Sequence, residues 1–141
     1  MRAGWGYDTV NGEQRSIGTR ELAGVFWRSF LLQASWSFER MQSLGFAFAM
    51  LPVLRKLNPD AAERASRVRD HMTYFNTQPY MASFVLGAAS RREKELAAGR
   101  RPPEDIAEIK TALAGPLGAL GDGFFWGGIK PLAAVLAVTL L

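Results

Sequence analysis

Large apolar residues recur along residues 26–54 at the three-and-four spacing of an amphipathic helix. One face of that helix would carry Leu31, Ala34, Phe38, Met41, Gly45 and Phe48. Polar residues interrupt the segment, namely Gln33, Glu39, Arg40 and Gln42. Ionisable groups inside an apolar assembly are costly unless they are paired or hydrated. The pattern therefore fits either an ordinary surface helix or a helix that packs among neighbours beside a binding or transport site.

This first helix is expected to begin near Thr19, whose side chain can cap the first turn, and to continue for about seven turns. Pro52 should end or kink it. Residues 1–18 are rich in glycine and polar residues without periodicity, and are expected to form a flexible N-terminus. They lack the continuous apolar core of a signal peptide.

A turn at residues 57–60 precedes a second, polar helix. Asp60 and Glu63 have the spacing of a capping box, which predicts a helix that runs to about Asp70. This helix is rich in arginine and is expected to be solvated.

Residues 71–89 are apolar and aromatic, but Asn76-Thr77-Gln78-Pro79 interrupts them near the middle. A straight helix of this length would barely cross a hydrocarbon layer of about 30 Å, and the proline disfavours one crossing. The segment fits a re-entrant hairpin, or a helix-turn-helix corner in a soluble protein.

The last third of the chain changes from charged to apolar. Residues 90–105 are expected to form a charged connector that ends in a helix start at Pro102-Pro103-Glu104-Asp105. Residues 113–141 hold many glycines and two prolines, which suggests close packing and broken helices. The chain stops within PLAAVLAVTLL, which is too short to span a membrane by itself, so we expect a truncated or partial chain.

Composition removes several kinds of chemistry. The 141 residues suit one domain, the net charge of +4 suits anionic lipid or nucleic acid, and there is no cysteine for disulfide, thiol or zinc-thiolate chemistry. His71 lacks a second histidine or a nearby carboxylate in the sequence, and residues 118–128 lack the features of a phosphate loop. The acids of the charged segments, Glu93 among them, are expected to be solvated. No catalytic constellation emerges, and no metal or cofactor is expected.

Three motifs carry a resemblance to a known family. They are FWRSFLLQASWSFERMQSLGFAFAMLPVLRKL, YFNTQPYMASFVLGA and GPLGALGDGFFWGGIKP. In this order they resemble the IID component of the mannose, fructose and sorbose family of the sugar phosphotransferase system. The resemblance covers residues 19–141, about the N-terminal half of a typical member, and makes these residues a IID-like membrane domain that is incomplete at its C-terminus.

The resemblance implies an all-α, multi-pass integral protein of the bacterial cytoplasmic membrane, with amphipathic and broken or re-entrant helices. Such a subunit pairs with a IIC subunit in a hetero-oligomer to take up mannose, fructose, sorbose or a related hexose. It would be non-catalytic, because the cytoplasmic IIA and IIB components carry the phosphohistidines. Nucleic acid would not be a partner.

The same motifs suggest site residues. Trp36, Glu39, Asn76 and Thr77 would bind sugar, because an aromatic ring can stack on the sugar face while carboxylate and amide groups accept and donate hydrogen bonds to hydroxyls. Glu39 and Asn76 are the leading pair. The alternative is that Glu39 pairs for structure with an arginine, for example Arg40 of a neighbouring subunit.

Asp122 and Lys130 would be further intramembrane charges, which either pair across a bend or fix a broken helix or the IIC contact. The chain departs from the family pattern in four places: Ser37 replaces asparagine, Gln78 replaces histidine, Gly123 replaces serine and Lys130 replaces arginine.

Two further interpretations remain open. One is a structural or regulatory remnant that keeps the fold and no longer transports. The other, from a different class, is a basic amphipathic adaptor on a membrane surface or on nucleic acid, although the alternation of arginines with acids disfavours it.

Overall fold

The computed structural model describes residues 16–100, 102 and 105–140. Six α-helices and one π-helical turn follow one another, and the described residues form no β-strand beyond two isolated bridges. The helices are α1 (Thr19–Ser29), α2 (Ser43–Leu57), α3 (Ala61–His71), α4 (Ala82–Ala97), α5 (Asp105–Phe124) and α6 (Lys130–Leu140), with the π-helical turn η1 (Phe125–Ile129) between the last two. The all-α prediction is confirmed. The proposed flexibility of residues 1–18 stays a prediction, since residues 1–15 lie outside the described ranges.

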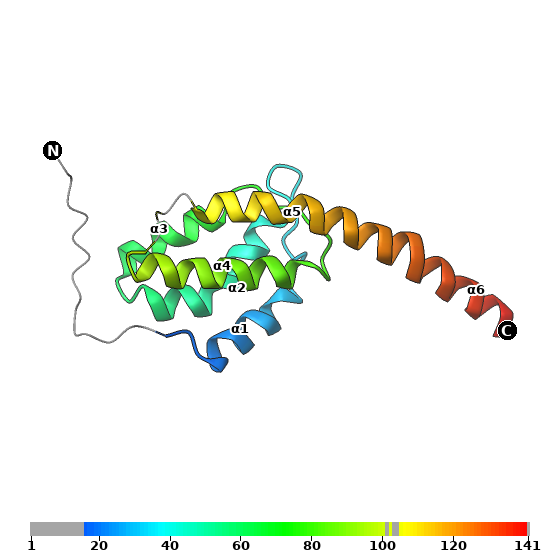
Figure 1. Cartoon of the computed structure of the whole chain (residues 1–141), viewed down its shortest axis with the longest axis horizontal. Coiled ribbons are helices and arrows are strands. Elements are labelled where there is room, and N and C mark those ends of the chain that lie inside the picture. Colours follow the sequence, from blue (N-terminus) through cyan, green and yellow to red (C-terminus); the bar gives the residue numbers. More distant parts are fainter. Residues whose placement is uncertain (1–15, 101, 103–104, 141) are drawn as a thin grey trace.

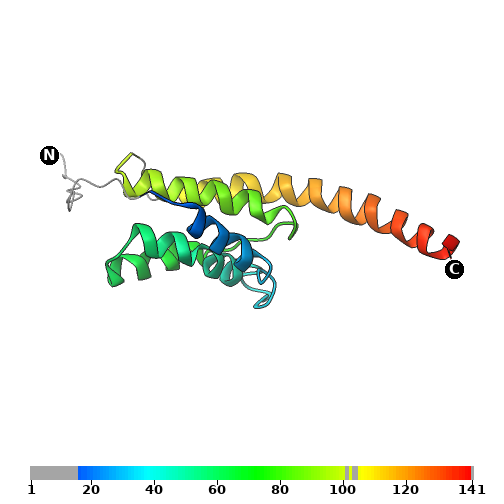
Figure 2. The same ribbon diagram turned by 90° about the horizontal axis from the view of Figure 1, so that it is seen from below.

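The helices form a bundle from which one long helix extends (Figure 1). In Figure 2, α4 and α5 lie side by side in one layer, and α2 and α3 lie beneath them. The second half of α5 and all of α6 extend beyond the bundle as one continuous helix (Figures 1 and 2). The core lies where α1, α2 and α4 meet, and its largest fully buried apolar side chains include Phe46, Met50, Leu54, Phe75 and Leu86.

The expected seven-turn helix is wrong, because the chain leaves the helix after Ser29 and resumes it only at Ser43. Leu32 turns inward and is buried, and its carbonyl group lies against Gly45, where a Cβ atom would overlap it. That contact requires the chain to fold back between the two halves of the apolar pattern. The face expected along residues 31–48 is therefore divided between a loop and α2.

The ends of the first two helices also differ from the expectation. Gly18 occupies the cap position before α1, and its N–H donates to the Glu21 carboxylate at 2.9 Å, so Thr19 is the first helical residue and not the cap. Pro52 does not end α2, which continues to Leu57, and the alternative expectation, a kink at this proline, stays a prediction.

The expected start of α3 with Asp60 as its cap is confirmed, although the reciprocal bond of a capping box, from the Asp60 N–H to the Glu63 side chain, is not among the contacts of the described residues. The Asp60 carboxylate accepts a hydrogen bond from the Glu63 N–H at 2.8 Å, and the helix runs from Ala61 to His71. The break at residues 76–79 is also confirmed, although residues 72–75 before it are not helical and α4 begins only at Ala82. The expected charged connector is largely wrong, because α4 continues to Ala97.

The glycines and prolines of the last third do not break the helix. One continuous helical segment, Asp105–Leu140, has 36 residues and a mean hydropathy of 1.5 in its most apolar part. The irregularity is limited to η1, where Lys130 N–H donates to the Phe125 carbonyl, five residues back. This wider turn ends two residues before Pro131, which cannot donate a backbone hydrogen bond. Residues 131–140 are thus the end of a long helix and not a separate short segment. The expected start near Asp105 is confirmed, although Pro103 and Glu104 lie outside the described residues.

Candidate functional site

The segment between α3 and α4 is held by buried hydrogen bonds from both sides. The Gln42 side chain makes two of them to Thr77, donating to its carbonyl at 2.9 Å and accepting from its N–H at 3.1 Å. The Thr77 hydroxyl donates to the Ala114 carbonyl of α5 at 2.9 Å. These bonds connect the end of the loop before α2, the break at residues 76–79 and the long helix.

Residues 77 and 78 also pack closely against α5. A Cβ atom on Gly121 would lie 2.5 Å from Gln78 Cβ, whereas one on Gly118 would lie 3.7 Å from the Thr77 hydroxyl. Gln78 is buried, and its side-chain oxygen accepts from the N–H groups of Tyr80 and Met81 at 2.6 and 3.3 Å. Gln78 thus satisfies backbone donors just before α4.

A short loop lies directly beside this segment. Ser37 and Met41 exchange two backbone hydrogen bonds of 3.2 and 2.8 Å, which leaves residues 38–40 at the tip. Met41 has a φ of 51°, an uncommon conformation for a residue with a side chain. Met41 also forms a parallel bridge with Phe75, and the next residue, Gln42, donates its N–H to the Phe75 carbonyl at 2.9 Å. The loop tip is thereby fixed next to residues 75–77.

The four residues suggested for sugar binding are all on these two neighbouring segments. Trp36 and Glu39 on the loop, and Asn76 beside it, are exposed. Thr77 is buried, and its hydroxyl and backbone groups are engaged within the chain. Trp36 packs edge-on against Phe38, with ring centroids 4.8 Å apart. The arrangement offers one carboxylate, one amide and an aromatic pair on one exposed surface.

The two charged residues predicted to lie within the membrane, Asp122 and Lys130, are not in contact with each other. Asp122 and Lys130 are exposed, and the described part of the chain shows no ion pair between them. Lys130 Nζ instead lies 3.3 Å from the centroid of the Trp126 ring. Pairing across a bend is therefore wrong, because the helix continues without a bend that could bring these residues together. A contact with a partner subunit stays a prediction for both.

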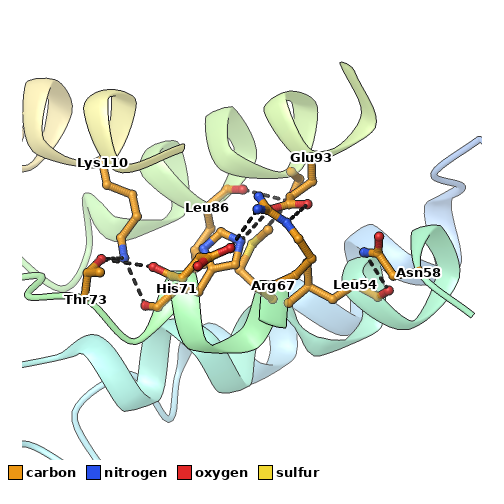
Figure 3. Close-up of polar contacts among 11 residues, drawn as sticks. Leu54, Asn58, Arg67, His71, Thr73, Leu86, Glu93 and Lys110 are labelled. Carbon is orange, nitrogen blue, oxygen red and sulfur yellow. Dashed lines mark hydrogen bonds and ion pairs between the residues drawn. The ribbon is translucent and has the colours of Figure 1, made fainter. Parts of the chain in front are cut away.

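Figure 3 shows a buried polar cluster that the sequence did not reveal. His71 Nε2 lies 2.9 Å from Glu93 Oε1, and Arg67 reaches the same carboxylate at 2.8 Å and Asp70 at 2.7 Å. Two expectations are therefore wrong: His71 does have a carboxylate partner, and Glu93 is buried. Their separation of 22 residues in sequence hid the contact, although Arg67 and His71 share one helix face at the i, i+4 spacing.

The protonation states within this cluster follow from its surroundings. Burial lowers the pKa of His71, although the Glu93 carboxylate partly opposes this effect. Burial alone would raise the pKa of Glu93, but hydrogen bonds from His71 and Arg67 outweigh burial and hold that pKa below its ordinary value. At neutral pH the histidine is therefore neutral and donates from Nε2 to an ionised carboxylate. The cluster joins α3 to α4.

Lys110 extends these contacts to α5. Its buried ammonium donates to the His71 carbonyl at 2.9 Å and to the Thr73 hydroxyl at 3.1 Å (Figure 3). It also lies 4.8 Å from the centroid of the Phe46 ring. The described residues contain no group of three or more histidine, aspartate or glutamate side chains placed to hold a metal ion.

Comparison with known proteins identifies the family. The model of the PTS system mannose/fructose/sorbose family IID component matches residues 16–141. The chain belongs to this family. The mannose-specific EIID component of Escherichia coli K12 is 42% identical over 130 residues, which cover 91% of this chain and 46% of that protein.

Further relatives and solved structures agree with this assignment. The sorbose-specific EIID component of Klebsiella pneumoniae is 36% identical and the fructose permease IID component of Bacillus subtilis is 32% identical, each over 91% of this chain and 47% of the relative. A chain in the structure of the mannose transporter ManYZ with microcin E492 superimposes with a TM-score of 0.85 at 41% identity, over 89% of this chain and 47% of that chain. The chain thus spans about half the length of the relatives that it matches.

Proposed function

We propose that this chain acts as a membrane subunit that forms, with a IIC partner, the pathway by which a phosphotransferase permease takes up a hexose. Cytoplasmic IIA and IIB components would transfer the phosphoryl group, and this chain would take no part in the chemistry. The observation that carries the proposal is the family match over residues 16–141, together with the similarity to a chain of a mannose transporter.

The long helix supports a place in the bacterial cytoplasmic membrane. At a rise of about 1.5 Å per residue, a hydrocarbon layer of about 30 Å needs about 20 residues. The segment Asp105–Leu140 exceeds this requirement with 36 residues, and its most apolar part is not buried within the chain. Lipid or a partner subunit would cover this surface. Further crossings by other segments, and thus a multi-pass topology, remain part of the proposal.

The sugar would meet this subunit at the loop tip and the adjoining break. Glu39 and Asn76 are exposed there on segments that Met41 and Phe75 hold together, and Trp36 offers an aromatic surface for the apolar face of a hexose. Thr77 fits a positioning role, because its hydroxyl already donates to α5 and its backbone bonds to Gln42. A IIC subunit would supply the opposite wall. Pairing of Glu39 with an arginine of that subunit is the structural alternative.

Membrane retention followed by uptake tests the proposal. The chain is expressed with and without a IIC subunit, and membranes are washed with high salt and then at alkaline pH. Retention supports an integral subunit. Release by salt would overturn the proposal in favour of a basic surface adaptor, whose binding should be electrostatic. Retention without sugar uptake, in cells that hold the IIC, IIA and IIB components, would indicate a non-transporting remnant.

Two substitutions then test the site. Glu39→Gln and Asn76→Ala should each lower uptake while leaving retention unchanged. Glu63→Gln is the matched control, because Glu63 is an exposed carboxylate on α3, away from the loop tip. Equal uptake by all three variants would refute the assignment of Glu39 and Asn76. Loss of co-purification with IIC in Glu39→Gln would favour the structural alternative.

A further inference from the structure

An open cleft lies between the loop tip and the end of α3. Its volume is about 570 Å³, and Arg40, Arg69, Met72, Thr73 and Tyr74 line it. Arg40 comes from the loop, Arg69 from the last turn of α3, and the other three residues from the chain that leaves α3. Side chains 29 or more positions apart in sequence therefore converge on one concave surface.

The lining of this cleft carries positive charge and no carboxylate. Within the described residues, the Arg40 and Arg69 guanidinium groups form no ion pair, whereas the neighbouring Arg67 is fully engaged with Asp70 and Glu93. Asp70, the acid next to Arg69 in sequence, bonds to Arg67 and forms no ion pair with Arg69. Two guanidinium groups thus remain available to a ligand.

The floor of the cleft is held rigidly. The Thr73 hydroxyl donates to the Asp70 carbonyl at 3.0 Å and accepts from buried Lys110 at 3.1 Å (Figure 3). Lys110 places a further cation directly behind the floor. Guanidinium groups match the oxygens of a phosphate with paired hydrogen bonds, which makes two converging arginines a typical phosphate-binding arrangement. The Tyr74 side chain, 62% exposed, adds an amphipathic rim.

The position of the cleft along the long helix indicates where such a phosphate would lie. Lys110 marks the last charge on α5 before Asp122, and the apolar part of the helix follows it. If that part lies in hydrocarbon, as the proposed function requires, Lys110 and the cleft stand at the level of the lipid headgroups. Basic pockets at this level are suited to anionic headgroups.

From this geometry we propose that the cleft between the loop tip and α3 is a phosphate-binding site, in which Arg40 and Arg69 hold the phosphate of an anionic phospholipid headgroup or of a soluble phosphate ester. The lipid source rests on the proposed membrane function, whereas the phosphate site itself does not. The site is separate from the surface assigned to sugar, since neither Asn76 nor Trp36 lines it.

Calorimetric titration of the purified chain in neutral detergent tests the proposal and separates the sources. The probes are dioctanoyl phosphatidylglycerol, dioctanoyl phosphatidylcholine, glycerol 3-phosphate, and glycerol as the phosphate-free control. Saturable binding of the anionic lipid in preference to the zwitterionic one assigns a lipid headgroup. Saturable binding of glycerol 3-phosphate without either lipid assigns a soluble ester. Glycerol should not bind.

Variants decide whether the bound phosphate lies in the cleft. The double variant Arg40→Gln/Arg69→Gln should weaken binding of the phosphate-bearing probe by about tenfold or more, since charge-assisted contacts are lost. The control Arg55→Gln/Arg100→Gln removes the same charge from exposed sites elsewhere and should change affinity by less than about twofold. Equal weakening in both variants, or no binding of any phosphate probe by the unaltered chain, would overturn the proposal. Unchanged unfolding midpoints in both double variants show that the fold is retained. Release of the chain from membranes by salt would refute the proposed function, but binding of the soluble phosphate ester could still be measured.

Discussion

The replacement of Gly121 by alanine tests the contact between the break at residues 76–79 and the long helix. The added Cβ atom would lie 2.5 Å from Gln78 Cβ, 2.6 Å from Gln78 Cγ and 3.0 Å from Met81 Cγ. A Cβ atom is attached directly to the backbone, so Gln78 can move away only if its segment moves. Gly115, on the same helix, supplies the control, because a Cβ atom added there would meet no packing neighbour within 4 Å.

The expected magnitudes follow from two opposing effects. Alanine in place of glycine within a helix stabilises it by about 0.5–1 kcal/mol. Overpacking a close contact costs about 1–3 kcal/mol. Gly115→Ala should therefore stabilise the chain, while Gly121→Ala should be about 1–3 kcal/mol less stable than Gly115→Ala. Gly118→Ala should resemble the control, because its Cβ would lie at an ordinary 3.7 Å from Thr77.

Thermal unfolding of the purified chain in detergent, followed by tryptophan fluorescence, measures this difference. For a chain of this size about 1 kcal/mol corresponds to a shift of roughly 4 °C in the apparent midpoint. Sugar uptake with a IIC partner gives a second readout, since displacement of Gln78 would also displace Asn76. Only Gly121→Ala should reduce uptake. Equal midpoints and equal uptake for Gly121→Ala and Gly115→Ala would refute the close contact.

Three other expected outcomes concern the buried cluster and the helix ends. Glu93→Gln should lower the free energy of unfolding by about 3 kcal/mol, because the positive charge of the buried Arg67 would lose its buried negative partner. Glu95→Gln on the same helix should have little effect. Equal unfolding midpoints in the two variants would contradict the role of burial. Burial lowers the pKa of His71 from its ordinary value of 6.5, so the unfolded chain takes up a proton there first and stability should decrease as the pH falls below 6.5. Melting curves from about pH 7.5 to about pH 5.5 should show this decrease, and His71→Gln, which cannot titrate, should flatten it; an equally steep decrease in the variant would argue against His71 as its source. Asp60→Ala should cost about 1 kcal/mol by removing the acceptor that caps α3, measured as a lower unfolding midpoint and contradicted by an unchanged one.

Signals that act over a few residues were predictive. The Asp60–Glu63 spacing predicted the start of α3, and the Asn76–Pro79 run predicted the break before α4. A cap satisfies backbone groups within one turn, and proline removes its own N–H, so both effects can be recognised from adjacent residues. The start of the long helix near Asp105 was predicted for the same reason.

Periodicity and composition were poorer guides where distant contacts intervened. The apolar pattern of residues 26–54 continues through residues 30–42, yet these residues form a loop and not a helix. The loop brings Gly45 against the Leu32 carbonyl, a contact that one straight helix could not make. Conversely, the glycines after Leu113 suggested broken helices, yet the helix continues through them. Some of those glycines serve packing, as Gly121 does beneath Gln78.

Residue order along the chain was sufficient to establish the helical class, the capped start of α3, the interruption at residues 76–79 and the motifs shared with the IID family. It could not show that Glu93 is buried and bonded to Arg67 and His71, or that Arg40 and Arg69 line one cleft. The reason is physical. Caps and turns depend on neighbours within a few residues, whereas burial of a charge and convergence of two cations depend on which helices pack together, and that is settled only when α3, α4 and α5 enclose a common interior.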